Sequence, residues 1–292
     1  MQKLTMQPDK NVKKILAVRT DRFGEFLLNI PALRALKETF PQARLTLITS
    51  PAVKELAELI PFADEVIVFD EGEDSFFGVL RAVAILRKSG FDLAVILNPA
   101  KFFHIATFLA GIPVRAGYGR KWGFLLTHKI KDTKYAGDMH EIDYNLELVR
   151  QVGAKTEDKR LSLDIGSDII NTVLKPLLPD KDRFIVVHPW TSDPVKQWPL
   201  THFKELTLRL LKEFGYGVVV IGGKAEKDKS RELFGNISDN RLIELTGKTS
   251  LKDLAYILKS SMLLISGDSG PVHLASCADV PVIALFRNDL QG

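Results

Sequence analysis

The sequence predicts an α/β protein made of two doubly wound halves that face a cleft. Apolar runs of four to seven residues, long enough for buried strands but too short for helices, alternate with helix-like stretches along the chain. This alternation is typical of parallel sheets. It loosens once, near the middle of the 292 residues, and then starts again. A content of 46% hydrophobic and 26% charged residues indicates a globular protein with a large core.

The first half is predicted to hold five strands and to close with a helix over residues 139–152. Because proline cannot continue a regular helix, Pro31 should kink the first helix, over residues 25–40, or start a new helical segment there. The strands are expected at residues 14–18, 45–49, 65–69, 91–97 and 114–117, and the other helices at 53–60, 76–88 and 100–110.

After the fifth strand comes a segment rich in basic and aromatic residues. One interpretation is a solvated surface loop. The other is a docking surface for an acidic, partly apolar partner such as a phosphorylated lipid headgroup at a membrane. The net charge of +4 favours anionic partners only mildly, and the chain has no nucleic-acid-binding motif. The residues of this segment are Tyr118, Arg120, Lys121, Trp122, Lys129, Lys131 and Lys134.

The second half begins after a link of mixed charge over residues 157–178. We therefore predict an N-terminal domain over residues 1–165 and a C-terminal domain over residues 166–292. Ser250 should cap a helix over 251–258, because serine at that position can bind the first free N–H groups. Further helices are expected over 203–214 and 272–278, and strands at 184–188, 218–221, 242–245, 262–265 and 280–286.

The single cysteine, Cys277, rules out an internal disulfide and suits a reducing cytosol. It lies on the apolar side of the last helix, so a buried structural thiol is expected rather than a nucleophile. There is no metal-ligand cluster of Cys or His, no signal-peptide pattern in the polar first 14 residues, and no apolar run of about 18 residues. We expect a cytoplasmic protein.

The last strand-turn-helix unit carries the sharpest functional signal. Asp268, Ser269 and Gly270 follow an apolar run and precede Pro271, which suits a first helical position. A helix that begins directly after a strand presents unpaired N–H groups and the positive end of its dipole, so it forms an anion site. Asp268 and His273 could bind hydroxyl groups beside a phosphate. The plainer alternative is an ordinary turn with Ser269 as the helix cap.

Three other strand ends in the second half suit a nucleoside diphosphate. After the first strand, Thr191 and Ser192 offer hydroxyl groups and Lys196 offers a positive charge to phosphate oxygens. After the second, Glu226 could accept hydrogen bonds from ribose hydroxyls. After the third, the backbone near Thr249 is free to contact the edge of a base. Each end is a weak signal alone, but four ends in one sheet make coincidence improbable.

Together these segments resemble the ADP-heptose:lipopolysaccharide heptosyltransferases, glycosyltransferase family 9. The resemblance covers nearly the whole chain, and residues 268–275 (DSGPVHLA) are its most specific part. It implies two Rossmann-like domains facing a cleft, the GT-B type. The other matching segments are residues 15–19 (ILAVR), Gly24-Glu25, 31–36 (PALRAL), 196–199 (KQWP), Gly222-Gly223 and 245–251 (LTGKTSL).

The resemblance implies an inverting, metal-independent transfer of heptose from ADP-heptose to a lipopolysaccharide inner-core acceptor, with no cofactor besides the donor. In the acceptor-binding N-terminal domain, Glu25 would take the proton of the acceptor hydroxyl. In the nucleotide-sugar-binding C-terminal domain, Glu226 would bind the ribose and Asp268 would face the sugar. Lys196 and the helix start would meet the charge of the leaving ADP. The residues placed around the diphosphate are Thr191, Ser192, Lys196, Ser269 and Gly270.

The chain departs from the family pattern at several places. The family usually has Asp where this chain has Glu25, which keeps the carboxylate on a longer side chain; the helix dipole alone also favours an acidic residue there. Trp190 replaces a small residue and should narrow the pocket, and Arg287 replaces a glycine. The chain stops at Gly292, so we expect a truncated, incomplete C-terminal domain. The lone Asp-x-Asp, at 180–182, precedes a strand and is interpreted as a solvated loop.

Two alternative functions stay open. A catalytically impaired relative would bind the nucleotide sugar without turning it over, which the Glu25 substitution and the short C-terminal end suggest. A sugar-nucleotide epimerase on the same fold would isomerise the sugar without an acceptor. A nicotinamide dehydrogenase is disfavoured, because no Gly-x-Gly-x-x-Gly follows the first strand.

Overall fold

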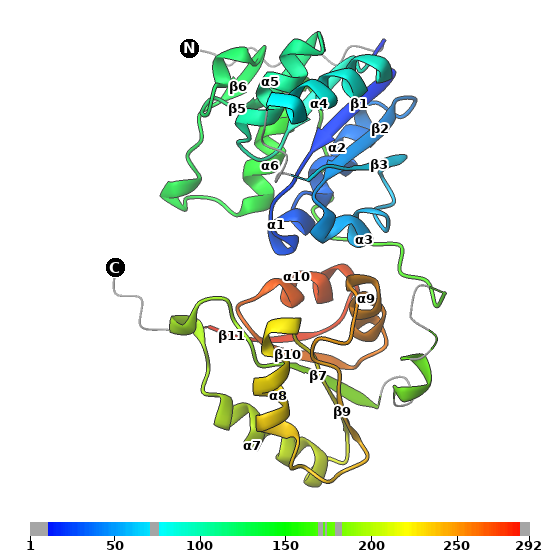
Figure 1. Cartoon of the computed structure of the whole chain (residues 1–292), viewed down its shortest axis with the longest axis vertical. Helices are drawn as coiled ribbons and strands as arrows, with labels where there is room; N and C mark the ends of the chain where they lie inside the picture. The colour runs from blue at the N-terminus through cyan, green and yellow to red at the C-terminus, as the bar shows by residue number, and fades with distance from the viewer. Residues whose placement is uncertain (1–10, 71–75, 169–171, 173, 179–182, 287–292) are drawn as a thin grey trace. The chain divides into compact units, whose positions relative to one another are not determined.

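The chain folds into two compact units, Met1–Leu161 (unit 1) and Ser162–Gly292 (unit 2). The computed structural model describes residues 11–70, 76–168, 172, 174–178 and 183–286, and each unit is considered by itself (Figure 1). The division lies near the expected domain boundary at residue 165. The Asp-x-Asp segment at 180–182 and Arg287 lie outside the described residues.

Within its described residues, unit 1 contains a six-stranded parallel sheet in the order β3-β2-β1-β4-β5-β6. The central strands are apolar and almost wholly buried, as expected for strands that helices cover on both faces. The strands are β1 (Lys14–Val18), β2 (Arg44–Thr49), β3 (Glu65–Val68), β4 (Leu93–Ile96), β5 (Val114–Tyr118) and β6 (His128–Ile130).

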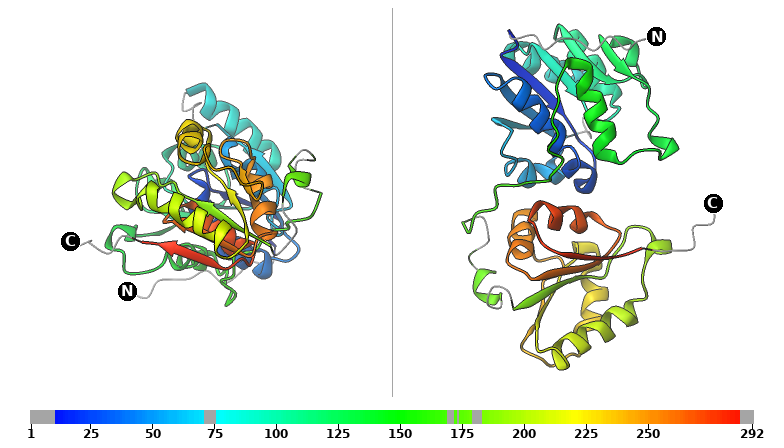
Figure 2. Two further views of the ribbon diagram at one scale, coloured as in Figure 1. Left: turned by 90° about the horizontal axis from the view of Figure 1, so that it is seen from below. Right: turned by 180° about the vertical axis from the view of Figure 1, so that it is seen from behind.

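Helices pack on both faces of this sheet. Leu16 and Val18 of β1 join Leu86 of α4 and Phe103 of α5 in one buried cluster. Because side chains alternate along a strand, Ile15 points to the opposite face, where α2 and α6 pack together (Figures 1 and 2). The helices are α1 (Phe23–Leu27), α2 (Ile30–Thr39), α3 (Lys54–Ala57), α4 (Phe76–Ser89), α5 (Lys101–Leu109) and α6 (Glu141–Val149), with 3-10 turns at Pro51–Val53, Gly123–Leu125, Lys134–Ala136 and Arg150–Val152.

Two expectations for unit 1 have clear outcomes. Pro31 starts a new helix, as predicted: α1 ends at Leu27, and Pro31 lies in the first turn of α2, where its missing N–H costs no hydrogen bond. The prediction that the sheet ends with the fifth strand was wrong, because β6 pairs in parallel with β5. Only Ile130 of β6 is buried, so this strand has no apolar run to reveal it.

Unit 2 contains, in its described residues, a five-stranded parallel sheet in the order β11-β10-β7-β8-β9. Val187 of β7 and Val220 of β8 lie in its core beside Phe203 of α7 and Phe234 of α8. The strands are β7 (Phe184–His188), β8 (Gly217–Val220), β9 (Leu242–Glu244), β10 (Leu263–Gly267) and β11 (Val282–Leu285). The helices are α7 (Leu200–Lys212), α8 (Lys227–Phe234), α9 (Leu251–Lys259) and α10 (Gly270–Cys277), with 3-10 turns at Lys175–Leu177, Pro194–Lys196 and Lys224–Glu226.

In unit 2 the predicted helix cap and the predicted buried cysteine are confirmed, whereas helix α8 was not predicted. Ser250 caps α9 in a reciprocal box with Asp253, as predicted. Cys277 is buried, and burial raises the pKa of its thiol to about 12, which agrees with a structural role. Helix α8 was not predicted, because its sequence is mostly charged and only Ser230 and Phe234 are buried.

The strand order reverses once in each sheet. Consecutive strands run one way from β1 to β3 and the other way from β4 to β6; in unit 2 the reversal lies between β7 and β10. Ligands of open parallel sheets bind outside the carboxyl ends of the strands at such a reversal point. No helix in the described part of the chain is long and apolar enough to cross a membrane.

Candidate functional site

An ion pair joins two loops at the reversal point of unit 2. Lys196 ends a 3-10 turn in the β7–α7 loop, and the Asp193 carboxylate fixes this turn by accepting the Val195 N–H. Lys196 Nζ lies 2.6 Å from the Asp268 carboxylate of the β10–α10 loop. The hydrogen bond to Asp268 raises the pKa of Lys196. Both side chains are exposed, 46% and 37%, so solvent reaches the pair.

Thr191 belongs to the same junction. Its Oγ1 donates to the main-chain oxygen of Asp193, 2.8 Å away. A Cβ at Gly267, the last residue of β10, would lie 2.7 Å from Thr191 Cγ2. The missing side chain at Gly267 therefore lets the threonine lie close to the end of β10. Ser192, next in the loop, is exposed.

A buried polar cluster lies directly at the ends of β7 and β10. His188 Nδ1 is 3.1 Å from Ser266 Oγ and 3.2 Å from Ser269 Oγ, and the two hydroxyl oxygens are 2.9 Å apart. Both hydroxyls are also within bonding distance of the Gly267 carbonyl oxygen. Burial lowers the pKa of His188 to about 4, so its imidazole is neutral at pH 7. The cluster fixes the side chain of Ser269 just before α10.

Helix α10 begins at Gly270, with Pro271 in its first turn. The Ser269 side chain makes no cap hydrogen bond to this helix; it bonds to the His188 cluster instead. Ser269 therefore occupies the N-cap position, as the plainer alternative expected, but its side chain does not cap the helix. The start of α10, next to Lys196 and the Ser269 hydroxyl, is a favourable place for a negative charge.

The next two loops lie at the same edge of the sheet. The Gly247 N–H donates to the Gly222 carbonyl oxygen, 2.9 Å away, and so connects the ends of β8 and β9. Gly247 has a φ of 71°, and a Cβ there would lie 3.2 Å from Lys224 Cα, so glycine is needed for this approach. Glu226 is half-buried at the end of a 3-10 turn in the first loop, and Thr249 is half-buried in the second.

Trp190 occupies the space between the ends of β7 and β8. It is 5% exposed, and its Nε1 donates to the Ile221 carbonyl oxygen, 3.1 Å away. Its ring lies so close to Gly222 that a Cβ there would clash with it. The large residue therefore fills part of this edge, where a small one would leave room.

Unit 2 thus brings most of the predicted donor residues to one edge. Those at the reversal point come from the β7–α7 and β10–α10 loops, and two more come from the neighbouring loops. His273 lies half-buried in α10. The residues at the reversal point are Thr191, Ser192, Lys196, Asp268, Ser269 and Gly270, and those in the neighbouring loops are Glu226 and Thr249.

In unit 1, Glu25 lies exposed in the first turn of α1, after the carboxyl end of β1. Asn29 Nδ2 donates to the main-chain oxygen of Glu25, 2.7 Å away, and so fixes the end of this short helix. Burial raises the pKa of the nearby Asp21, and the negative charge of Glu25 adds to this rise. Two interacting carboxylates therefore stand at this strand end.

A charged network at the reversal point of unit 1 was missed in the sequence. Arg19, 2% exposed, places Nε 2.5 Å from Asp21 Oδ1 and Nη2 3.4 Å from Glu141 Oε1. Its Nη1 donates to the carbonyl oxygen of Leu97 after β4, 3.1 Å away, and Lys134 also pairs with Glu141. An arginine directly after an apolar strand was a usable signal. Its partner Glu141 in α6, and Lys134, which pairs with the same carboxylate, are too distant in sequence for spacing to reveal.

The family model of glycosyltransferase family 9 (heptosyltransferase) matches residues 79–291. This chain belongs to that family. A putative glycosyltransferase of Haemophilus influenzae is 27% identical over 95% of this chain and 83% of its own length. The family 9 structure from Veillonella parvula has a TM-score of 0.82 at 22% identity, covering 95% of this chain and 81% of that one. The E. coli ADP-heptose lipopolysaccharide heptosyltransferase II has a TM-score of 0.80 at 22% identity, covering 94% and 84%. The GT-B-type α/β fold is thereby confirmed.

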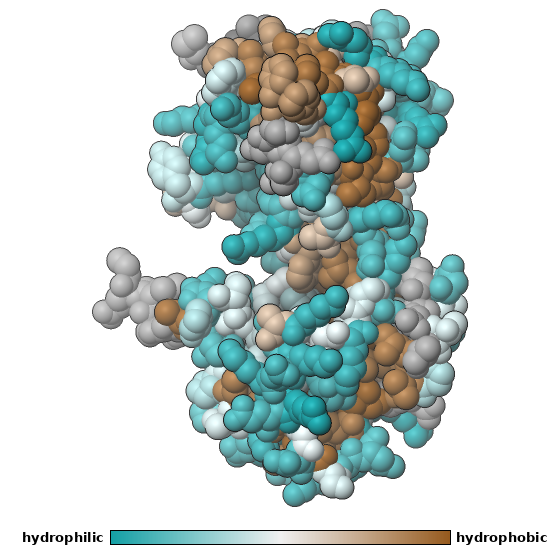
Figure 3. All heavy atoms as spheres, viewed as in Figure 1, coloured by the Kyte–Doolittle hydropathy of each residue, from teal (hydrophilic) through white to brown (hydrophobic). Residues whose placement is uncertain are grey.

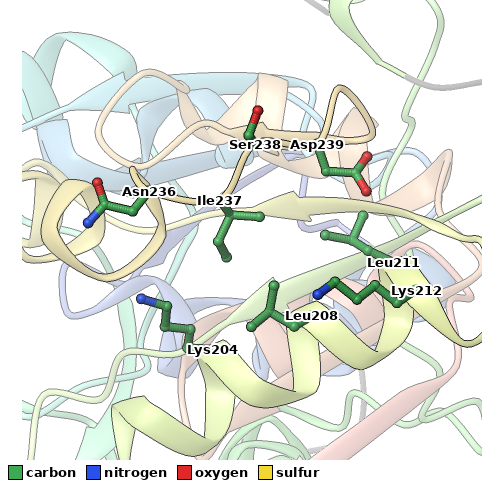
Figure 4. Close-up of a pocket in the computed structure, with 8 residues that line it drawn as sticks. All are labelled: Lys204, Leu208, Leu211, Lys212, Asn236, Ile237, Ser238 and Asp239. Carbon is green, nitrogen blue, oxygen red and sulfur yellow. The ribbon is translucent and has the colours of Figure 1, made fainter.

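A pocket of about 280 Å³ in this family 9 glycosyltransferase lies away from the loops described above (Figure 4). It is formed by α7 and by the segment that leads into β9, so it adjoins the amino end of β9 rather than its carboxyl end. None of the predicted donor residues lines it. The lining residues are Lys204, Leu208, Leu211, Lys212, Asn236, Ile237, Ser238 and Asp239.

The described part of the glycosyltransferase chain comprises residues 11–70, 76–168, 172, 174–178 and 183–286. Among those residues, no three His, Cys, Asp or Glu side chains gather closely enough to hold a metal ion. Metal independence of the reaction stays a prediction.

Proposed function

We propose that this chain transfers heptose from ADP-heptose to a hydroxyl group of the lipopolysaccharide inner core, with inversion and without a metal ion. The observation that carries the proposal is the junction at the reversal point of unit 2. There, the Lys196–Asp268 ion pair lies beside the Ser269 hydroxyl and the start of α10. The junction supplies a cation, hydroxyl groups and a helix dipole to a diphosphate. The name of the E. coli relative, which includes ADP-heptose and lipopolysaccharide, supports the choice of substrates.

In the donor complex, the diphosphate takes the place of Asp268 at Lys196. Thr191, Ser192, Ser269 and Gly270 surround the same phosphate oxygens, and Asp268 turns to the hydroxyl groups of the heptose. In the neighbouring loops, Glu226 accepts hydrogen bonds from the ribose and the backbone near Thr249 contacts the adenine edge. His273 lies beside the sugar hydroxyls.

The reaction follows from these roles. The acceptor oxygen attacks the anomeric carbon and forms the new glycosidic bond, while the bond from that carbon to the ADP oxygen breaks. Glu25 accepts the proton of the acceptor hydroxyl, so it acts as general base. The electron pair leaves with ADP, and Lys196 and the start of α10 offset the added negative charge.

The proposed acceptor places the protein at the cytoplasmic side of the inner membrane, as a peripheral protein. Family membership favours group transfer over the epimerase alternative. The catalytically impaired relative remains the second candidate, because Glu25 replaces the usual aspartate.

The test incubates the purified chain with ADP-heptose and a deacylated inner-core acceptor, and measures ADP release and the mass of the acceptor. We expect ADP release that depends on the acceptor and continues in the presence of EDTA, together with an acceptor heavier by one heptose. Tight ADP binding without release would favour the impaired relative. An isomerised sugar without acceptor would favour the epimerase.

A further inference from the structure

An exposed aromatic pair stands on the loop that follows β5 in unit 1. Trp122 is 47% exposed and Phe124 is 69% exposed, and their ring centroids are 5.6 Å apart. Lys101 Nζ lies 5.0 Å from the centroid of the Trp122 ring. We call residues 120–124, with this pair at their end, the Trp122 loop. Exposed apolar groups that are rimmed by polar residues are a feature of membrane and protein interaction sites.

Buried groups hold this loop in an unusual backbone conformation. Lys121 and Trp122 both have left-handed φ angles, 48° and 71°, which cost free energy in residues other than glycine. The buried His104 donates from Nδ1 to the Lys121 carbonyl oxygen, 2.9 Å away. Arg120 pairs with Asp132 at 2.8 Å. These contacts therefore fix the backbone of the Trp122 loop, and the fixed loop exposes the side chains of Trp122 and Phe124 to solvent.

The surroundings of the loop carry a strong excess of positive charge. Residues 115–135 contain six basic residues and a single acidic one, Asp132. The Asp132 side chain is 8% exposed and already paired with Arg120, so it offsets little of the charge that a partner would meet. Lys121, Lys129 and Lys131 are exposed.

We propose that the Trp122 loop docks unit 1 on a membrane surface that carries anionic headgroups. A tryptophan ring lies favourably at headgroup level, where its apolar ring and its N–H are both satisfied, and a phenylalanine ring buries at the headgroup–acyl boundary beside it. The exposed lysines pair with lipid phosphates, and their aliphatic stems lie along the interface. This inference deepens the proposed function, on which its choice of a lipid partner rests.

The position of the loop fits that role. Lys101 follows β4, the loop follows β5, and Glu25 follows β1. All three strands are parallel members of one sheet, so these residues lie at its same carboxyl edge. A membrane bound by the loop would therefore meet the edge of unit 1 at which the general base is proposed.

A second apolar surface on α4 carries less support. Phe76, Phe77 and Leu80 are exposed, and brown residues cover the region of α4 in unit 1 (Figure 3). No comparable set of cations over aromatic rings or fixed left-handed residues belongs to α4 among the described residues. The structure gives no indication of what covers this surface.

The test uses the full chain and vesicles of phosphatidylcholine with or without a third of phosphatidylglycerol. We expect co-sedimentation with the anionic vesicles only, weakened by salt, and a blue shift of tryptophan emission. The shift reports Trp122, because Trp190 is buried and Trp198 is half-buried. The double change Trp122→Ala with Phe124→Ala should reduce vesicle affinity at least tenfold. Phe214→Ala, at an exposed phenylalanine of unit 2, should leave the affinity unchanged.

A second double variant distinguishes weaker membrane binding from a loss of folding. Lys121→Glu with Lys129→Glu alters only exposed side chains and should also reduce binding to anionic vesicles tenfold or more. The proposal would be overturned if the unchanged protein did not bind the anionic vesicles, or if either double variant bound them as tightly as the unchanged protein. Transfer to the deacylated acceptor should be unchanged in all variants, so a failure of the proposed function is seen separately from a failure of membrane docking.

Discussion

The residues Lys196 and Asp268 illustrate how a binding group can be kept in position at little cost to folding. An exposed ion pair contributes only about 0.2–1 kcal/mol to stability, and both side chains are exposed. The pair holds the lysine at the reversal point, where we propose that the diphosphate binds. Changes to this pair should therefore affect ligand binding far more than folding.

The first prediction concerns the lysine itself. Lys196→Ala should weaken ADP binding at least about tenfold, because one charge-assisted hydrogen bond is lost. Isothermal titration calorimetry measures the affinity, and the melting temperature should stay nearly constant. Lys212→Ala, at an exposed lysine of the same unit, is the matched control. An unchanged ADP affinity in Lys196→Ala would refute the phosphate assignment.

The second prediction concerns the base. Glu25→Gln should keep the ADP affinity and lower turnover by about 10²–10⁴, the usual contribution of a general base. Glu25→Asp restores the residue that is usual in the family and should retain activity. The acceptor-dependent release of ADP measures both variants. Full turnover in Glu25→Gln would move the base to another residue.

The third prediction is a pH effect at His188. Its pKa in the folded protein, about 4 because of burial, is below the ordinary value near 6.5, so the unfolded state binds the proton more readily. The stability that depends on neutral His188 is complete above about pH 6.5 and falls as the pH drops towards 4. Between pH 7 and 5 the loss should be about 2 kcal/mol.

Urea unfolding at pH 7 and pH 5 measures this loss. His188→Gln has no imidazole to protonate at this position, so its stability should change less between the two pH values. His202→Gln, at an exposed histidine, should behave like the unchanged protein. Equal pH dependence in all three proteins would contradict the assignment to His188.

At the scale of helices and strands, the elements with many buried apolar residues were the ones that the sequence predicted. Strands such as β1, β4, β7 and β8 are buried on both faces, so they appear as continuous apolar runs. Strand β6 lies at the sheet edge with one buried residue, and α8 presents mostly charged side chains to solvent. Tertiary contact, not local pattern, creates these two elements, so the pattern alone did not predict them.

The fourth prediction tests a local feature that the sequence did reveal. Ser250→Ala removes the side-chain oxygen that accepts the Asp253 N–H at the start of α9, and should destabilise unit 2 by about 1 kcal/mol. Ser276→Ala, at an exposed serine within α10, should cost much less. Urea unfolding of both variants measures the difference. Equal midpoints would show that the cap contributes nothing to stability.

At the scale of the whole molecule, each unit gathers its polar side chains at a reversal point of its sheet. The positions of Lys196, Asp268 and Ser269 could be predicted because each follows an apolar strand. Their partners could not: His188 was seen only as a strand end, and Ser266 lies inside β10. In unit 1 the contact from Arg19 to Glu141 crosses more than one hundred residues of sequence, and only the fold brings them together.

The fifth prediction concerns that long-range contact. Arg19→Met removes the arginine from Asp21 and Glu141, so that Glu141 keeps only its ion pair with Lys134 among the described residues. Because the breaking of a buried ion pair usually costs about 3–5 kcal/mol, the variant should be destabilised by that amount. Arg44→Met removes an exposed partner of Glu65 and should cost no more than about 1 kcal/mol. Thermal unfolding compares them. Equal losses of stability in Arg19→Met and Arg44→Met would show that the buried contacts of Arg19 stabilise the protein no more than an exposed ion pair does.

The parallel pairing of β7 with β10 has a consequence for biosynthesis. Ile185 lies opposite Leu263, so the strand that completes the Lys196 site leaves the ribosome long after the strand it joins. Pairings between distant segments form slowly, and domains tend to fold in the order of their synthesis. A nascent chain should therefore hold a finished unit 1 while Asp268, the partner of Lys196, is still untranslated. The proposed nucleotide site is complete only after β10 and the loop that follows it have been made.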